Sequence, residues 1–231
     1  MELLLKLMDV SGVSGNEESV RDLISKEIET HVDEISTDKL GNLIAVKKGK
    51  MPKVMLAAHM DEVGLMIKKI ESNGNIKCTS IGEVEANSLV GKKVKINAKS
   101  NFIIGTIKSK KSKKKSVKDI FIKTKFSRKE LLKNNVEVGS CISFENYSDI
   151  KKNLVEGRAL DNRIGCFTLI ELAKRLKKSK NEVYFVFTVQ EEIGLYGAKT
   201  SAFEIQPDWA ITVDATEAKK EASKSDVFIG N

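Results

Sequence analysis

Hydrophobic and polar positions divide the chain into three stretches of different periodicity. In the first, about residues 1–66, apolar residues recur at helical spacing over 16–29, and Ser14 and Asn16 are available as caps of that helix. A further helix is expected before it, and strands are expected after it at 32–37, 43–46 and 54–58. The last of these strands is apolar throughout, which is typical of a strand covered on both faces of a sheet.

The second stretch, about residues 67–156, changes to short segments of alternating hydrophobicity separated by turn signals. One short helix is expected over 127–133. The expected strands lie at 65–70, 76–81, 90–96, 102–107, 120–122 and 136–144. Closely spaced strands with intervening turns predict a small β-barrel or β-sandwich.

The third stretch returns to longer elements. It predicts a helix over 162–178, an apolar strand at 184–189, a loop with a short helix, and a strand at 209–213. The predicted fold class is α/β, with a mixed sheet flanked by helices and interrupted by an inserted small all-β, barrel-like domain. We expect a catalytic α/β domain over 1–66 and 157–231, and an insert that mediates oligomerisation over 67–156.

The composition is that of a globular protein, with 41% hydrophobic and 31% charged residues. No stretch approaches the roughly 20 apolar residues of a membrane span. Glu2 stands where a secretory signal would carry a positive charge. The three cysteines are an odd number without a C-x-x-C pair, so we expect reduced, buried thiols. These features predict a cytoplasmic protein.

Much of the net charge of +8 lies in residues 108–118, where seven of eleven residues are lysine. Such a run can bind nucleic acid or an anionic surface. It contains no aromatic residue or arginine, the groups that stack on bases or bind phosphate in two-pronged fashion. We therefore favour a solvated, mobile loop over a nucleic-acid surface, with the steering of acidic peptides as a further possibility.

Polar residues that could carry chemistry follow two of the predicted apolar strands. His59 and Asp61 come directly after one, and a carboxylate two residues from an imidazole can fix its tautomer, as it does in metal sites. Glu191 and Glu192 come directly after another. Two adjacent carboxylates at the end of a core strand repel each other, and a nearby cation would remove that conflict.

Two further acids complete the set, although each also has an ordinary structural explanation. Asp161 stands at a predicted helix start and could be a simple N-cap, and Asp214 ends the last apolar strand. One imidazole and three carboxylates suit Zn²⁺, Co²⁺ or Mn²⁺. The predicted metal ligands are His59, Asp161, Glu192 and Asp214. A carboxylate that bridges two ions roughly 3.5–4 Å apart would create a two-metal site, with Glu191 as general base on its water.

These residues, in this order, resemble the M42 family of metallo-aminopeptidases, which includes tetrahedral and glutamyl aminopeptidases and proteins labelled endoglucanase M. The resemblance spans nearly the whole chain, and the set His-x-Asp, Asp-x-Arg-x-Gly and Gln-Glu-Glu is specific. The matching segments are residues 12–15, 37–43, 57–64, 157–165, 187–195 and 213–214.

The resemblance implies a role for each residue. Asp161 would bridge two divalent ions, Zn²⁺ or Co²⁺, His59 and Asp214 would complete one ion, and Glu192 would belong to the other. Glu191 would be the general base and Asp61 would orient His59. It further implies short peptides as substrates, subunit contacts through the β insert, and assembly into dimers or dodecamers.

The chain departs from the family pattern in three places. The family usually has a second metal-binding histidine in a C-terminal segment, whereas the other histidine here, His31, lies in a polar stretch and is expected at the surface. The resemblance therefore implies a C-terminally truncated form with low or absent turnover. Asn162 stands where many members have a second aspartate, and the lysine run of 108–118 replaces a loop that shapes the assembly or pocket in relatives.

Three alternative functions stay open at this point. The missing histidine and the lysine run are compatible with a non-catalytic assembly or binding protein of the same fold. The endoglucanase label suggests glycan hydrolysis, which uses paired carboxylates without requiring a metal. Binding of nucleic acid through the lysine run would depend strongly on salt.

Overall fold

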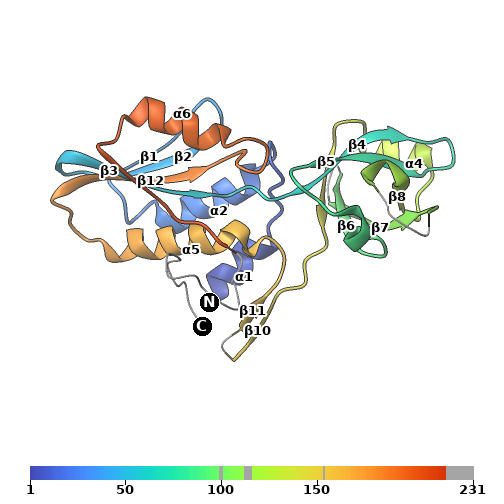
Figure 1. Cartoon of the computed structure of the whole chain (residues 1–231), viewed down its shortest axis with the longest axis horizontal. Helices are drawn as coiled ribbons and strands as arrows, with labels where there is room; N and C mark the ends of the chain where they lie inside the picture. Colours follow the sequence, from blue (N-terminus) through green and yellow to red (C-terminus); the bar gives the residue numbers. More distant parts are fainter. Residues whose placement is uncertain (99–100, 112–115, 153, 217–231) are drawn as a thin grey trace, which may run out of the picture.

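The computed structural model describes residues 1–98, 101–111, 116–152 and 154–216, and it forms two lobes that lie side by side (Figure 1). One lobe is a five-stranded mixed sheet with helices on both faces, and the other is a closed six-stranded barrel. The predicted fold class, an α/β fold interrupted by an all-β barrel, is confirmed.

The mixed sheet has the strand order β1-β2-β12-β3-β13. Its strands are β1 (Glu34–Thr37), β2 (Leu43–Lys47), β3 (Lys50–His59), β12 (Asn181–Thr188) and β13 (Trp209–Thr212). β2 runs antiparallel to both β1 and β12, whereas β12 and β13 each pair with β3 in parallel. The carboxyl ends of β3, β12 and β13 therefore lie at the same edge of the sheet, where open α/β sheets present functional groups.

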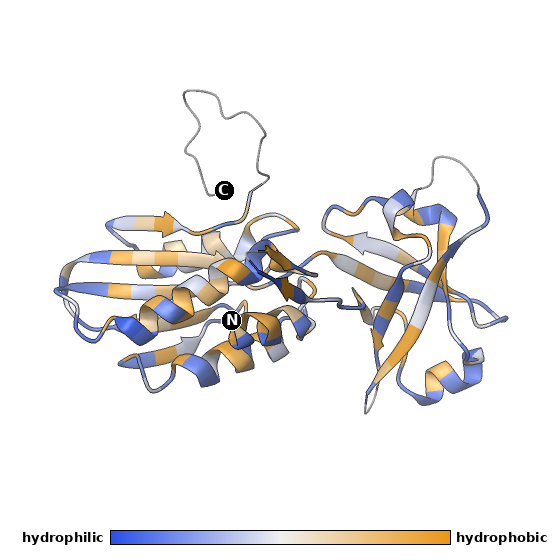
Figure 2. Cartoon of the chain, turned by 90° about the horizontal axis from the view of Figure 1, so that it is seen from below, coloured by the Kyte–Doolittle hydropathy of each residue, from blue (hydrophilic) through white to orange (hydrophobic). Residues whose placement is uncertain are grey.

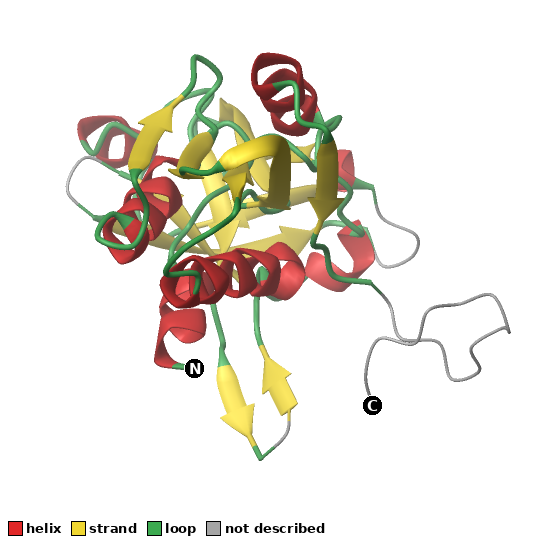
Figure 3. Ribbon diagram, turned by 90° about the vertical axis from the view of Figure 1, so that its left-hand side faces the viewer, coloured by secondary structure: helices red, strands yellow, loops and turns green. Residues whose placement is uncertain are grey.

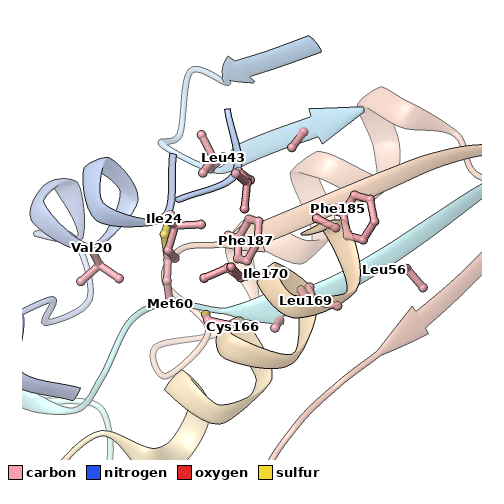
Figure 4. Close-up of a cluster of buried hydrophobic side chains, with 14 of the residues drawn as sticks. Val20, Ile24, Leu43, Leu56, Met60, Cys166, Leu169, Ile170, Phe185 and Phe187 are labelled. Atoms are coloured by element: carbon pink, nitrogen blue, oxygen red, sulfur yellow. The ribbon is translucent and has the colours of Figure 1, made fainter. Parts of the chain in front are cut away.

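Helices on both faces of the sheet explain why its central strands are apolar throughout (Figures 1 and 3). The helices are α1 (Glu2–Asp9), α2 (Glu18–Ile28), α5 (Leu160–Arg175) and α6 (Tyr196–Ile205). Phe185 and Phe187 of β12 pack on Ile170 of α5 in the core that Figure 4 shows. On the opposite face, Val186 packs with Ile205 of α6. Among the described residues, none of these helices combines the length and the hydrophobicity that a membrane crossing requires.

The second lobe is a barrel in which the strands close in the order β4-β5-β8-β7-β6-β9. Its strands are β4 (Gly64–Ile70), β5 (Ile76–Ile81), β6 (Lys93–Asn97), β7 (Phe102–Ser109), β8 (Ile120–Lys123) and β9 (Cys141–Phe144). Two short helices, α3 (Ala86–Leu89) and α4 (Arg128–Lys133), accompany them. Hydrophobic and hydrophilic residues alternate along the barrel strands (Figure 2), and the inward ones form a separate apolar core. Closure of the barrel pairs the backbone N–H and C=O groups that the edge strands of an open sheet would expose.

Some predicted elements differ from the structure because the backbone turns where a strand was expected. The segment 136–140 is not a strand, since Asn135 and Gly139 have φ values of 57° and 93° and the chain turns there before β9. Gly91, with φ of 91°, likewise delays the start of β6. The sequence also gave no sign of the small antiparallel ribbon of β10 (Asp149–Lys151) and β11 (Leu154–Glu156), which projects from the α/β lobe (Figure 3).

The predicted caps of the second helix are wrong. Glu17 occupies the N-cap position of α2 without a capping side-chain hydrogen bond. The Ser14 hydroxyl instead donates to Asp61 at 2.6 Å. A residue that suits a helix cap by type is thus used at the candidate site.

The described parts of the lysine run adjoin β7 and β8 of the barrel. Lys108 belongs to β7, and η1 (Val117–Asp119), a short 3₁₀ helix, precedes β8. Lys111 pairs with Asp119 at 2.8 Å, an exposed contact of small energetic weight. Residues 112–115, the middle of the lysine run, lie outside the described residues.

The three cysteines are free, and their thiols are poorly suited to ionise. Burial raises the pKa of Cys166 to about 12 and that of Cys78 to about 11. Because thiolate is the reactive form, we expect native protein at pH 8 to react slowly with a disulfide reagent such as DTNB. In denatured protein all three thiols should react rapidly. Half-buried Cys141 should react first. Rapid modification of Cys166 in the folded chain would contradict this prediction.

Candidate metal centre

The predicted site residues converge at the carboxyl edge of the sheet. His59 is the last residue of β3, Glu191 follows β12, Asp214 follows β13, and Asp161 lies in the first turn of α5. The His59 Nε2 atom lies 3.2 Å from Asp161 Oδ1, 3.6 Å from Asp214 Oδ1 and 3.8 Å from Glu191 Oε2. Four segments that are far apart in the chain therefore meet around one imidazole.

Two groups of potential ligand atoms share this imidazole. In one group, atoms of His59, Asp161 and Asp214 lie within 4.8 Å of one another, and in the other the same holds for His59, Glu191 and Glu192. His59 is 4% exposed, whereas Asp161 and Asp214 are open to solvent. The donor atoms thus line the rim of the sheet with the imidazole at the bottom.

Asp61 is fully buried and makes more contacts than the sequence indicated. Its Oδ1 lies 3.4 Å from His59 Nδ1, which is also 3.2 Å from the Asp61 backbone oxygen. The same carboxylate accepts the backbone N–H groups of Glu191 and Glu192 at 3.0 and 3.2 Å. Asp61 therefore contacts the imidazole and also accepts the backbone N–H groups of the glutamate pair.

The charges of the site favour a cation. Burial lowers the pKa of His59, but Asp61, Glu191 and Asp214 outweigh that effect and raise it to about 9. Burial, together with the neighbouring acids and against the effect of His59, raises the pKa of Glu192 to about 7, and burial also raises the pKa of Glu191. Carboxylates brought together in this way are stabilised by a positive ion, and imidazole with carboxylate oxygens is a donor set that binds divalent transition metals. The residues present fit a metal centre.

Asn162 connects two of the acidic segments, a role that sequence reasoning missed. Its side-chain N–H donates to the Val213 carbonyl at 2.8 Å, and its Oδ1 accepts the Gly165 N–H at 3.1 Å. The first bond ties the start of α5, next to Asp161, to the residue before Asp214. An aspartate could not donate that bond in its ionised form.

A buried ion cluster under the site was also missed. Glu62 accepts the Gly12 N–H at 2.9 Å, forms an ion pair with Arg158, and lies 3.6 Å from Arg163. Arg158 and Arg163 in turn donate to backbone carbonyls at the end of α1. The adjacency of Glu62 to His59 and Asp61 was the available signal, since an acid in a buried motif needs a partner.

His31 takes no part in the site. It lies in the turn after α2, where its backbone N–H donates to Ile28 and its carbonyl accepts from Lys47. The structure therefore brings together His59 and all five predicted acids, and it leaves the second histidine elsewhere.

Comparison with known proteins agrees with this geometry. The family model for M42 glutamyl aminopeptidases matches residues 41–231. The chain belongs to the M42 peptidase family. A relative from Acetivibrio thermocellus that carries the name "Putative aminopeptidase" is 44% identical over 221 residues, which are 93% of this chain and 66% of the relative.

Solved structures of similar aminopeptidases and peptidases have the same fold. Aminopeptidase APDkam598 from the archaeon Desulfurococcus kamchatkensis is 33% identical with a TM-score of 0.89, over 97% of this chain and 66% of that one. The TET1 peptidase of Pyrococcus horikoshii, which can assemble into a tetrahedron or a large octahedral shell, is 30% identical with a TM-score of 0.86, over 92% and 68%. The chain spans about two thirds of the length of the relatives it matches.

Proposed function

We propose that this chain provides most of the active site of a dinuclear-metal aminopeptidase that releases N-terminal residues from short peptides. The observation that supports it best is the convergence of five carboxylates on the buried imidazole of His59. His59, Asp161 and Asp214 would hold one ion, and Asp161 would bridge to a second held by Glu192. Zn²⁺ or Co²⁺ as the ion and a cytoplasmic location stay predictions from the sequence.

The chain's own residues account for proton transfer and positioning. When bound, divalent ions supply Lewis-acid polarisation of the peptide carbonyl and lower the pKa of water. Burial is the main cause of the raised pKa of Glu191. A general base accepts and returns a proton most efficiently when its pKa lies near the operating pH, and the shift is in that direction. Glu191 would take a proton from water and pass it to the leaving amine, while Asp61 holds both the imidazole and the glutamate backbone in place.

Among the residues that the structure describes, the second ion has few ligands. Within the described ranges, His59 is the one imidazole that reaches the cluster, because His31 lies in the turn after α2. We therefore expect weaker binding of the second ion and low or absent turnover by the chain alone. A non-catalytic assembly or binding homologue is the alternative, and metal content with turnover distinguishes the two.

Self-association is proposed on the behaviour of relatives. The TET1 peptidase of Pyrococcus horikoshii can assemble into a tetrahedron or a large octahedral shell. We infer that this chain forms dimers or larger assemblies, up to dodecamers, in which the barrel lobe mediates contacts. Its mass in solution, measured by light scattering, tests this directly.

The metal centre is tested by replacing the shared ligand. Asp161→Asn should reduce bound divalent metal by at least one ion per chain, since an amide is a weaker ligand than a carboxylate. Metal content after dialysis, measured by mass spectrometry, gives the readout, and Asp22→Asn on the exposed side of α2 is the control. The proposed function fails when wild-type protein incubated with Zn²⁺ or Co²⁺ retains no ion, or when D161N retains as much as wild type.

A further inference from the structure

The turn that presents Glu191 and Glu192 is held by side chains rather than by a neighbouring strand. Four consecutive backbone N–H groups, those of residues 189–192, each donate to a side-chain oxygen. The acceptors are Asn42 Oδ1 for Val189 at 2.9 Å, Glu17 Oε1 for Gln190 at 3.1 Å, and the two oxygens of Asp61 for Glu191 and Glu192. We refer to Asn42, Glu17 and Asp61 as the acceptor cradle.

The shape of the backbone explains why the cradle is needed. β12 ends at Thr188, and Gln190 has a φ of 56°, so the following N–H groups leave the line of the strand ladder. An unpaired buried N–H is costly, and the turn would present several of them without these acceptors. All three acceptors are buried, with Asn42 and Asp61 at 0% and Glu17 at 5% exposure.

Unlike Asp61, Glu17 is given no part in the proposed reaction. Its Oε1 also accepts the Gly15 N–H at 2.8 Å, so one oxygen joins the chain before α2 to the glutamate turn. A buried carboxyl is costly unless it is hydrogen-bonded, and these two N–H groups offset that cost. Burial nevertheless raises the pKa of Glu17.

We propose that Glu17 is a positioning residue for the metal centre. By binding the Gln190 N–H it fixes the turn, and thereby directs the side chains of Glu191 and Glu192 toward His59. The consequence for the metal rests on the proposed function, whereas the holding of the turn does not.

The test compares four variants in the full chain. Glu17→Leu removes the acceptor at similar size, and Glu17→Gln keeps an acceptor oxygen without the charge. Glu17→Asp shortens the side chain by one methylene and serves as the milder variant should Glu17→Leu not fold. Glu18→Leu, at an exposed neighbouring glutamate, is the matched control.

Two readouts separate the turn from the metal. Hydrogen exchange of the Gln190 amide in metal-free protein should be about tenfold faster in E17L and E17D than in wild type, which corresponds to loss of one hydrogen bond. E17L and E17D should also bind Co²⁺ about tenfold more weakly, with an altered visible absorption spectrum, because the spectrum reports ligand geometry. E17Q should restore both readouts, and E18L should change neither.

The proposal is overturned when exchange at Gln190 is unchanged in both E17L and E17D, or when it accelerates while Co²⁺ affinity and spectrum stay those of wild type. It is also overturned when E17Q behaves like E17L, since the charge rather than the hydrogen bond would then hold the turn. If wild-type protein binds no Co²⁺, the proposed function fails, and the exchange measurement by itself decides whether Glu17 holds the turn.

Discussion

Glu62→Gln is expected to destabilise the protein by about 3–5 kcal/mol, the usual cost of breaking a buried ion pair by removing one partner. The Glu62 side chain is 3% exposed, and those of Arg158 and Arg163 are 8% and 0% exposed. Glutamine would leave both guanidinium groups buried without an anion. Among the described residues, Nε of each arginine and Nη2 of Arg163 already lack a hydrogen-bond partner, so little is available to compensate.

Equilibrium unfolding in urea measures this effect against a matched variant. Glu27→Gln removes the same charge from an ion pair with Lys174 at 2.6 Å, but those side chains are 30% and 25% exposed. Such a pair contributes about 0–1 kcal/mol, so E27Q should unfold close to wild type. Equal stability of E62Q and E27Q would show that the buried cluster does not stabilise the lobe.

Glu191→Gln is expected to slow any aminoacyl-p-nitroanilide hydrolysis by about 10²–10⁴-fold, the usual contribution of a general base. The glutamine side chain keeps the shape of the glutamate but cannot accept the proton. Glu191 and Glu192 both lie in the group around His59. The proposal makes Glu191 the general base and Glu192 a metal ligand.

Metal content distinguishes the two glutamates whether or not turnover is measurable. Glu191→Gln should keep the metal of wild type, because the proposed ligands are intact, whereas Glu192→Gln should lose affinity for one ion. The assignment of roles is wrong if E191Q loses metal and E192Q keeps it, or if E191Q hydrolyses substrate at the wild-type rate.

Local pattern was sufficient to predict the architecture and most of the site. The apolar runs at the ends of β3 and β12 are typical of strands covered on both faces, and polar residues directly after such strands are expected at one edge of an α/β sheet. For that reason His59, Glu191 and Glu192 could be grouped before any coordinates were known. The alternating segments likewise predicted a barrel, although Gly91 and Asn135 shortened two of its strands.

The tertiary structure alone decided which groups pair with the backbone N–H groups of the site and with its buried charged side chains. The sequence places Ser14 before a helix start, where short-range preference predicts capping, yet its hydroxyl binds Asp61. Glu17, at the N-cap position of α2, accepts the Gln190 N–H instead of capping the helix. In the sequence, Glu62 is one more acid in a motif. In the structure it contacts Arg158, from the segment before α5, and Arg163 of α5. Periodicity reports which face of an element is buried, whereas hydrogen-bond and ion-pair partners depend on distances between segments that are 47 to 173 residues apart in the chain. The sequence by itself therefore determined which side chains could form the centre, and packing determined what holds them there.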